Sequence, residues 1–514
     1  MKRSSKVSIG LTVAGALFSV AVSNAQNAGN WTTYRNDAGR AGVQKNENAI
    51  TKESLAKDFK FLWKLKLGKD AGDFRSYSEP LLIFRLINAQ GFKDFVTWTD
   101  SQNLYAVDSE LGKMLWEKHY DVAPTPCGKS NLPMTMEPPL VINFGARRAP
   151  GTPPPVPQPL VPAAQRRIGI AAGGGGFGFK GVYVLTPDGM LHEQVITTGA
   201  DYGPPVKFVP GAAGISNGLG FGSKILYTVT SAGCAGTENA LYSINVSAPD
   251  YPVSSYKTKA VPQVAALGPT LGDGVAYVVT GKGSDDASAG IYANSIVALS
   301  PDGKVKDWYT AGSDLKSVTP VAFTYKDKKL LVAPGKDGSF VLLDSASLGG
   351  SDHKTALAQT APVSKAKSDL PTALAVWQDS TGTAWVFASI AGAVEGGAKF
   401  GTTNGASSHG SIVAFKIDEE GGKMSLTPQW VSRDFVSPTP PVIANGFVVA
   451  LSQGNASTHA KLFVLDTATG KELYTSGESI PTYAHMAGIS VGDGHVFFVT
   501  HDNTLSSFGI GIEH

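Results

Sequence analysis

Two glutamates, one aspartate and one histidine each stand close to the start of a stretch that reads as a β-strand. They are Glu79, Glu137, Asp369 and His485. Carboxylate oxygens are preferred ligands of Ca²⁺, and a carboxylate or an imidazole can act as a general base. The alternative is that these side chains line a polar channel and face water. Either outcome requires a fold that brings together residues from both halves of the chain.

Other patterns that resemble catalytic motifs lack the elements that the chemistry needs. Gly173-x-Gly175-x-x-Gly178 matches a dinucleotide fingerprint, but the strand that follows it offers no helix terminus to a phosphate. The Gly-x-Ser-x-Gly runs at 214–218 and 488–492 have no strand-turn-helix setting, so we expect glycines at strand bends. The nine histidines show no His-x-x-x-His spacing, and neither cysteine lies in a Cys-x-x-Cys-His haem site.

The chain begins with the features of a secretory signal peptide. Lys2, Arg3 and Lys6 precede an apolar run over 7–22, and small residues before a cut after Ala25 complete the pattern. The run is too short to span a membrane, and no other stretch approaches the required length. We therefore expect residues 1–25 to be removed and the mature protein to be periplasmic or secreted, with no membrane span.

The charge balance excludes some classes of partner. Without the three basic residues of the leader, the chain has 41 of its 44 basic residues and 42 acidic ones. No electrostatic attraction to nucleic acid follows from this balance. We expect a monomer whose partner is a protein, a glycan or a small molecule, bound in a central funnel or on a face of loops.

The sequence contains eight copies of one pattern, in which a short apolar strand leads into a turn. The clearest copies are 104–116 and 462–474, which share an acidic turn with glycine and a second strand ending in an aromatic residue. The smallest spacing between copies is 43 residues, the size of one four-stranded propeller blade. The copies begin at Leu104, Val182, Leu241, Ile296, Phe340, Ile412, Leu462 and Leu505.

A strand marked by proline and then an apolar strand precede most copies, so each blade reads as four strands from the axis outward. The last copy ends at Phe508 without an outer strand, and the alternating segment 61–67 can supply it. Such pairing closes the ring and leaves no open edge strand. The sequence thus predicts an all-β, eight-bladed β-propeller over 59–514, closed by an N-terminal strand and preceded by an extension over 26–58.

These repeats resemble the pyrroloquinoline-quinone (PQQ) repeat proteins, whose propellers are quinoprotein-like. Ala106-x-Asp108-x-x-x-Gly112-Lys113-x-x-Trp116 looks like the tryptophan-docking motif of that family, in which the aromatic ring packs between neighbouring blades. The resemblance covers roughly residues 31 to 510. Trp63, Trp308, Trp430 and Tyr474 fall at or near the position of Trp116 in their own units.

The resemblance implies two functions. Non-catalytic members act as binding or assembly platforms, and we take this as the first hypothesis. The alternative is a PQQ- and calcium-dependent alcohol or sugar dehydrogenase, with Asp369 or Glu137 as base and metal ligand and with Glu79, Tyr202 and His485 contacting the cofactor. Quinoprotein alcohol dehydrogenases typically carry adjacent cysteines against PQQ, whereas the two cysteines of this chain are 107 residues apart.

The chain also contains two cysteines that can pair and three long insertions between the predicted strands. In an oxidising compartment we expect Cys127 and Cys234 to be joined in a disulfide, and the alternative is two separate buried thiols. The insertions are a proline-rich loop at 149–164, a glycine-rich loop at 172–181 and a hairpin extension at 389–411.

Overall fold

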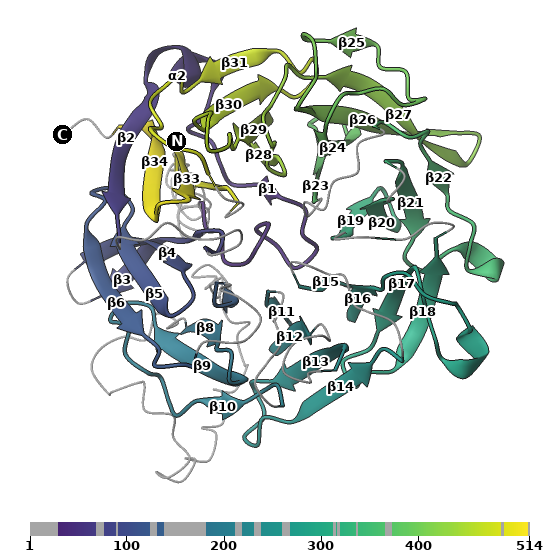
Figure 1. Cartoon of the computed structure of the whole chain (residues 1–514), viewed down its shortest axis with the longest axis horizontal. Coiled ribbons are helices and arrows are strands. Elements are labelled where there is room, and N and C mark those ends of the chain that lie inside the picture. The colour runs from purple at the N-terminus through teal and green to yellow at the C-terminus, as the bar shows by residue number, and fades with distance from the viewer. Residues whose placement is uncertain are drawn as a thin grey trace, which may run out of the picture.

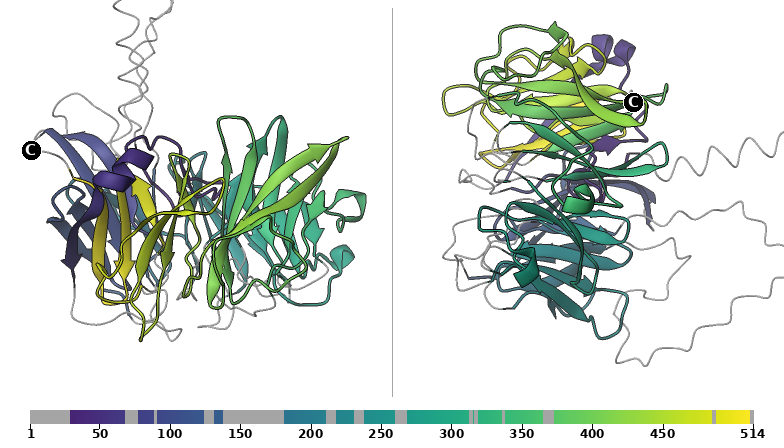
Figure 2. Two further views of the ribbon diagram at one scale, coloured as in Figure 1. Left: turned by 90° about the horizontal axis from the view of Figure 1, so that it is seen from above. Right: turned by 90° about the vertical axis from the view of Figure 1, so that its right-hand side faces the viewer.

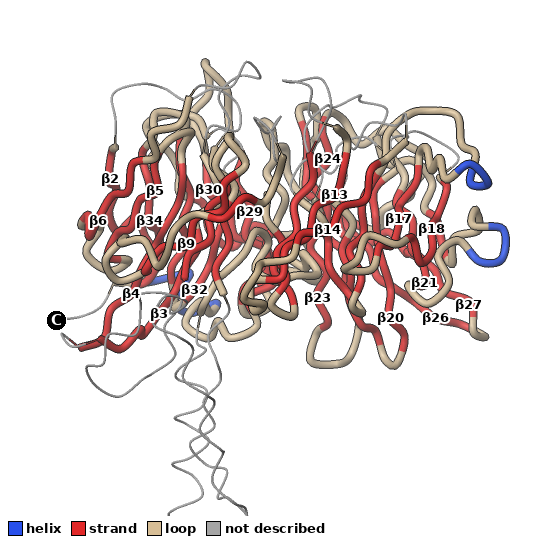
Figure 3. Tube along the Cα trace, turned by 90° about the horizontal axis from the view of Figure 1, so that it is seen from below, coloured by secondary structure: helices blue, strands red, loops and turns tan. Residues whose placement is uncertain are grey.

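Eight small β-sheets surround a central axis in the computed structural model (Figure 1). The strands run roughly along this axis, and the ring is flat when it is seen edge-on (Figure 2; Figure 3). The prediction of an all-β, eight-bladed propeller is therefore confirmed. The structure describes residues 29–67, 77–88, 91–123, 131–137, 181–210, 218–230, 238–259, 268–311, 315, 319–335, 338–364, 373–484 and 488–511.

The first four blades each contain four strands, which follow one another from the axis outward. Blade 1 contains β3 (Leu81–Asn88), β4 (Gly91–Thr99), β5 (Asn103–Asp108) and β6 (Met114–His119). Blade 2 contains β7 (Met134–Met136), β8 (Gly181–Leu185), β9 (Met190–Val195) and β10 (Val206–Lys207). Blade 3 contains β11 (Gly220–Gly222), β12 (Ile225–Thr230), β13 (Ala240–Asn245) and β14 (Val253–Lys257). Blade 4 contains β15 (Thr270–Gly272), β16 (Val275–Val279), β17 (Ser295–Leu299) and β18 (Val305–Thr310).

The last four blades include two sheets with a fifth strand. Blade 5 contains β19 (Val321–Tyr325), β20 (Lys328–Pro334), β21 (Phe340–Asp344) and β22 (Ala358–Gln359). Blade 6 contains β23 (Leu374–Gln378), β24 (Ala384–Ala391), β26 (Gly410–Glu420), β27 (Lys423–Val431) and β25 (Thr402–Thr403). Blade 7 contains β1 (Val43–Gln44), β28 (Val442–Ala444), β29 (Phe447–Ser452), β30 (Lys461–Asp466) and β31 (Glu472–Thr475). Blade 8 contains β32 (Ser490–Gly492), β33 (His495–Thr500), β34 (Thr504–Ile510) and β2 (Phe59–Lys66).

The described helices are short. They are α2 (Lys52–Lys57), η2 (Ala287–Ala289) and η3 (Gly350–Asp352). None of the helices in the described part of the chain has the length and apolar character of a membrane span.

Tight turns join the inner strand of several blades to the second strand. Asn445 and Gly446 in blade 7 have φ angles of 45° and 76°, and Asp493 and Gly494 in blade 8 have 48° and 79°. Positive φ at both central residues matches the twist of the two strands, and Asn-Gly or Asp-Gly pairs reach it at low cost. These turns mark one end of the ring, which we call the turn end.

The ring is closed by pairing between the two ends of the chain. Strand β2 is antiparallel to β34, with Phe59 opposite Ile510 and Lys66 opposite Thr504. Trp63 of β2 then reaches the next blade, where its indole N–H donates to the Ser109 carbonyl at 3.0 Å. The predicted closure by an N-terminal strand is therefore confirmed.

Tryptophans on outer strands dock on the glycine turn of the following blade. Trp116 of blade 1 donates to the Ile196 carbonyl at 2.8 Å and lies on Gly199 of blade 2. Trp430 of blade 6 donates to the Thr467 carbonyl at 2.8 Å and lies on Gly470 of blade 7. Both glycines have φ near +70°, and a Cβ there would overlap the ring. The glycine thus provides both the left-handed turn and the flat surface that the indole covers.

Blade 2 differs from the sequence prediction by one strand. The copy at Val182 was expected to be a third strand, but it is the second strand, β8, and β9 is the third. The Pro187-Asp188-Gly189 turn after β8 resembles the Pro301-Asp302-Gly303 turn that joins third and outer strands in blade 4. A tight turn specifies a hairpin but not which pair of strands in the blade it connects.

The insertion at 389–411 is more than a hairpin extension. It connects β24 to β26, and within it β25 pairs in parallel with Trp430 and Val431 of β27. It therefore adds a fifth strand to the outer edge of blade 6, away from the axis.

Candidate functional site

The centre of the ring holds the chain's own N-terminal extension, which crosses it between the inner strands (Figure 1). Backbone hydrogen bonds join residues 31–42 to the inner strands of six blades. They pair Trp31 with Leu82, Thr32 with Met136, Ala38 with Leu271, Gly39 with Ala322, Ala41 with Val376 and Gly42 with Ile443, at 2.8–3.0 Å. Side chains complete the circle, because Arg40 reaches Leu219 of blade 3 and Gln44 reaches Val491 of blade 8. The extension is thus bonded to all eight blades.

Two buried arginines extend this network to the residues that begin the inner strands. Arg40 donates to the carbonyls of Leu219 and Pro269 at 3.0 and 3.2 Å. Arg35 donates to the carbonyls of Leu374 and Pro441 at 2.8 and 2.5 Å. Guanidinium groups have five N–H donors and no acceptor, so they satisfy carbonyls that converge from several blades. Burial lowers the pKa of Arg40 to about 10, and its charge is retained at neutral pH.

Glu79, one of the residues predicted to contact a cofactor, anchors this extension. Its Oε1 accepts hydrogen bonds from Trp31 Nε1 at 2.7 Å and from the Arg35 backbone N–H at 2.8 Å. Its Oε2 is buried and has no hydrogen-bond partner among the described residues. Burial raises the pKa of Glu79 to about 7, although the positive charge of Arg35 opposes the rise. A Cβ at Gly488 would lie within 2.4 Å of Oε2, so only glycine permits this approach.

The structure places Glu137 and Tyr202 elsewhere, and these positions correct the sequence analysis. Glu137 follows the inner strand β7 instead of preceding one, and it forms an ion pair with Lys224 in the β11–β12 turn. It therefore lies at the turn end, whereas Glu79 precedes β3 at the opposite end. Tyr202 lies between β9 and the outermost strand β10, where it lines a pocket of about 510 Å³ with Tyr120 and His192. The prolines that follow Tyr202 do not mark an inner strand of blade 3.

Other predicted features lie outside the described residues. These are the candidate base and metal ligand Asp369, the candidate cofactor contact His485, the cysteines Cys127 and Cys234, the insertion 149–164, and 172–180 of the glycine-rich insertion. The expectations for them remain predictions.

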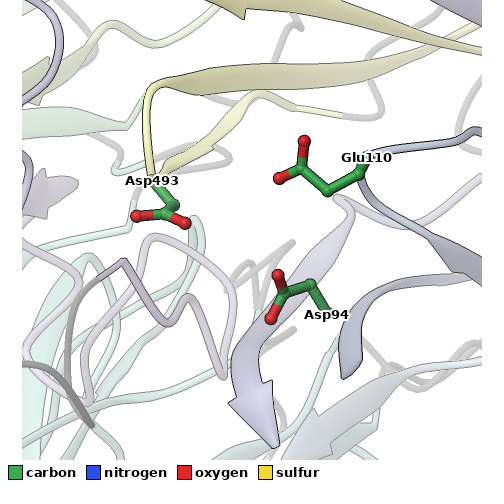
Figure 4. A group of neighbouring side chains, drawn as sticks. All are labelled: Asp94, Glu110 and Asp493. Carbon is green, nitrogen blue, oxygen red and sulfur yellow. The ribbon is translucent and has the colours of Figure 1, made fainter. Parts of the chain in front are cut away.

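Three carboxylates that the sequence analysis missed meet at the turn end between blades 8 and 1 (Figure 4). Asp94 on β4, Glu110 in the β5–β6 turn and Asp493 in the β32–β33 turn offer oxygens within 4.8 Å of one another. Such a set could hold a hard divalent cation. Burial and the Asp493 charge raise the pKa of Asp94, and burial also raises the pKa of Glu110.

Two basic side chains lie beside this acidic cluster. Arg85 donates to Asp493 Oδ1 at 3.1 Å, and its backbone N–H donates to Asp94. His495 Nε2 lies 3.6 Å from Glu110 Oε2. The only sequence signal for the cluster was the Asp493-Gly494 turn, because closure of the ring is what brings blade 8 against blade 1.

The structure describes part of the set of residues predicted to hold PQQ and calcium. Of the five residues predicted for this role, Glu79, Glu137 and Tyr202 are described, and they lie at three separate places. Glu79 is engaged by the extension, Glu137 by Lys224, and Tyr202 stands on the outer rim. The acidic cluster lies apart from these three residues, because it is at the turn end between blades 8 and 1, whereas Glu79 is at the opposite end and Glu137 and Tyr202 belong to blade 2.

No protein-family model and no curated protein matches this sequence. Solved structures match the fold. A quinohemoprotein alcohol dehydrogenase from Comamonas testosteroni is 13% identical with a TM-score of 0.54, over 98% of this chain and 83% of the other. A second, from Pseudomonas putida HK5, is 12% identical with a TM-score of 0.54, over 97% and 82%.

A europium-containing methanol dehydrogenase is 12% identical with a TM-score of 0.50, over 93% of this chain and 90% of the other. This chain shares their eight-bladed propeller fold. At such low identity the likeness concerns the fold alone, because one propeller scaffold hosts many unrelated functions. What those enzymes bind and oxidise is therefore not carried over to this chain.

Proposed function

We propose that this protein is a non-catalytic, PQQ-like β-propeller that acts as a rigid binding or assembly platform. The observation that carries the proposal is the N-terminal extension, which occupies the centre of the ring and bonds to every blade. A ring whose centre is filled by its own chain offers its faces and rim to partners. Rigid scaffolds with binding regions on their surface are a common arrangement in proteins.

The dispersed positions of Glu79, Glu137 and Tyr202 support the platform over the dehydrogenase. A PQQ- and calcium-dependent oxidation needs a base, a metal and a cofactor held in contact, and geometry decides such a candidate before its pKa does. None of these three side chains lies near another. The fold likeness to quinoprotein dehydrogenases does not alter this argument, since it extends only to the scaffold.

A titration with the cofactor tests the proposal. PQQ and CaCl₂ are added to the purified mature protein in a calorimeter, and dye reduction is then followed with a panel of alcohols and aldoses. We expect neither heat of binding nor dye reduction. Stoichiometric PQQ binding together with substrate-dependent dye reduction would overturn the platform and establish the enzyme.

We also propose that the protein works outside the cytoplasm, after removal of residues 1–25. The charged start, apolar run and small cleavage site of the leader support export. In that compartment Cys127 and Cys234 would be joined in a disulfide. The intact mass of protein recovered from the periplasm or medium should correspond to a chain that begins at Gln26. The same protein, denatured without a reducing agent, should not react with a thiol reagent, and it should react after reduction.

A further inference from the structure

A pocket of about 890 Å³ opens at the turn end of the ring, between the N-terminal extension and the inner strands of blades 5, 6 and 7. Its volume lies in the range of small-molecule binding sites. One wall is the extension at Ala41, Val43 and Lys45, and the opposite wall is formed by β19 and β23. The pocket therefore exists only because the extension lies in the ring.

Two partly exposed aromatic side chains line this pocket from neighbouring blades. Phe323 lies on β19 and Trp377 on β23, and these two inner strands contact each other. Trp377 is directly opposite Trp385 in the sheet, and its ring lies against Gly446 of blade 7. Its indole N–H has no hydrogen-bond acceptor among the described residues. A rigid aromatic face with a free N–H donor suits a ligand that has both an apolar face and polar edges.

The polar groups of the pocket are fixed by bonds to the backbone. Asn445 donates its amide N–H to the Ile50 carbonyl at 2.8 Å, and Gln378 donates to the Gly382 carbonyl at 2.9 Å. Each amide oxygen is therefore held as an acceptor. Asp37 accepts the Ala41 N–H through Oδ1 at 2.9 Å, which leaves Oδ2 as a further acceptor.

The charge of the lining is almost balanced. Lys45 is the basic residue of the lining, and burial raises the pKa of Asp37 and so opposes its negative charge. Glu47 is buried, and its oxygens accept the backbone N–H groups of Ala49, Ile50 and Gly494. A strongly charged ligand would find no surplus of opposite charge in this lining. Amide and carboxylate acceptors beside aromatic rings match the hydroxyl groups and C–H faces of sugars instead.

We infer that this pocket binds the sugar rings of a neutral glycan, with a ring on Trp377 and Phe323 and hydroxyls on Asn445, Gln378 and Asp37. This inference rests on the proposed platform function and names its ligand class. The extension is then part of the site, because it supplies Asp37 and the wall at Val43.

The experiment is a calorimetric titration of the mature protein with three neutral trisaccharides: maltotriose, cellotriose and tri-N-acetylchitotriose. We expect at least one to bind at millimolar concentration or below, with a change in tryptophan fluorescence. Trp377→Ala should weaken that binding by at least about tenfold, whereas Trp377→Phe, which keeps an aromatic face, should bind within a few-fold of the wild type. Tyr292→Ala is the control, since Tyr292 is a partly exposed aromatic residue on blade 4 outside this pocket.

Failure of all three sugars to bind at millimolar concentration would overturn the inference. The inference would also be overturned if the Trp377→Ala variant, with a native circular dichroism spectrum, bound the sugar as tightly as the wild type. The platform proposal fails on a different result, which is PQQ binding with dye reduction. A protein that binds neither sugar nor PQQ would remove the glycan site and leave the platform standing.

Discussion

The docking of Trp430 on Gly470 joins blade 6 to blade 7 and allows a quantitative test of how the blades are held together. Trp430 is fully buried, and its indole N–H donates to the Thr467 carbonyl at 2.8 Å. Gly470 has a φ of +70°, and a Cβ there would lie 2.3 Å from the Trp430 ring. Gly470→Ala therefore adds a steric overlap to the strain of a left-handed alanine.

The overlap and the strain can be separated. We expect about 1–2 kcal/mol for a left-handed alanine and about 1–3 kcal/mol more for displacing the indole. Gly274→Ala is the matched control, because Gly274 has a φ of +76° and nothing lies within 4 Å of its Cβ position. Trp430→Ala alone should cost about 3–5 kcal/mol through the cavity and the unpaired carbonyl.

The double variant gives the decisive comparison. In the Trp430→Ala background the methyl group of Gly470→Ala meets no ring, so its cost should fall to that of Gly274→Ala. The coupling energy should then be about 1–3 kcal/mol, measured by urea unfolding followed by far-ultraviolet circular dichroism. Equal costs of Gly470→Ala in both backgrounds would refute the docking, as would a Gly274→Ala variant as destabilised as Gly470→Ala.

Three other predictions concern the centre and the closure of the ring. The folded-state pKa of Glu79, about 7, lies above its ordinary value of 4.5. Between these pH values the folded protein keeps a proton on Glu79 that the unfolded chain loses, so the free energy of unfolding should fall by up to about 3 kcal/mol as the pH rises from 4.5 to 7. Glu79→Gln should flatten this fall, and a wild-type stability constant from pH 4.5 to 7 would contradict it. Arg40→Met should lower the free energy of unfolding by more than about 3 kcal/mol because it leaves several buried carbonyls unpaired. Lys45→Met, at an exposed position, should change it by less than about 0.5 kcal/mol. Similar effects of the two variants in chemical denaturation would argue against a stabilising role of the Arg40 hydrogen bonds. Deleting residues 59–67 should replace one cooperative thermal transition with a broad, early one, and a truncated protein as stable as the whole would disprove closure by β2.

The repeats made the ring predictable from sequence. The segments at Leu104 and Leu462 became the third strands β5 and β30, and the alternating segment 61–67 became most of the closing strand β2. These features depend on local patterns of apolar residues and turn residues that recur along the chain. Blade 2 failed this rule at Val182 because its tight turn joins a different pair of strands.

The path of the N-terminal extension through the ring was not predictable in the same way. Arg35 and Arg40 bond to carbonyls 179 or more residues away, and those carbonyls converge only once the ring has closed. A buried arginine also leaves no mark in a single sequence, since arginine usually lies at the surface. Prolines follow both Glu137 and Tyr202, as they would before an inner strand, but in blade 2 these segments do not lead into one.

Amide hydrogen exchange of the native protein over residues 31–44 tests the central claim most directly. If this segment lies in the ring and bonds to the inner strands, the amides of Trp31, Arg35 and Gly42 should exchange about as slowly as those of β28 and β29. Exchange of these amides at the rate of an unstructured peptide would mean that the extension lies outside the ring, and the platform built on it would have to be abandoned.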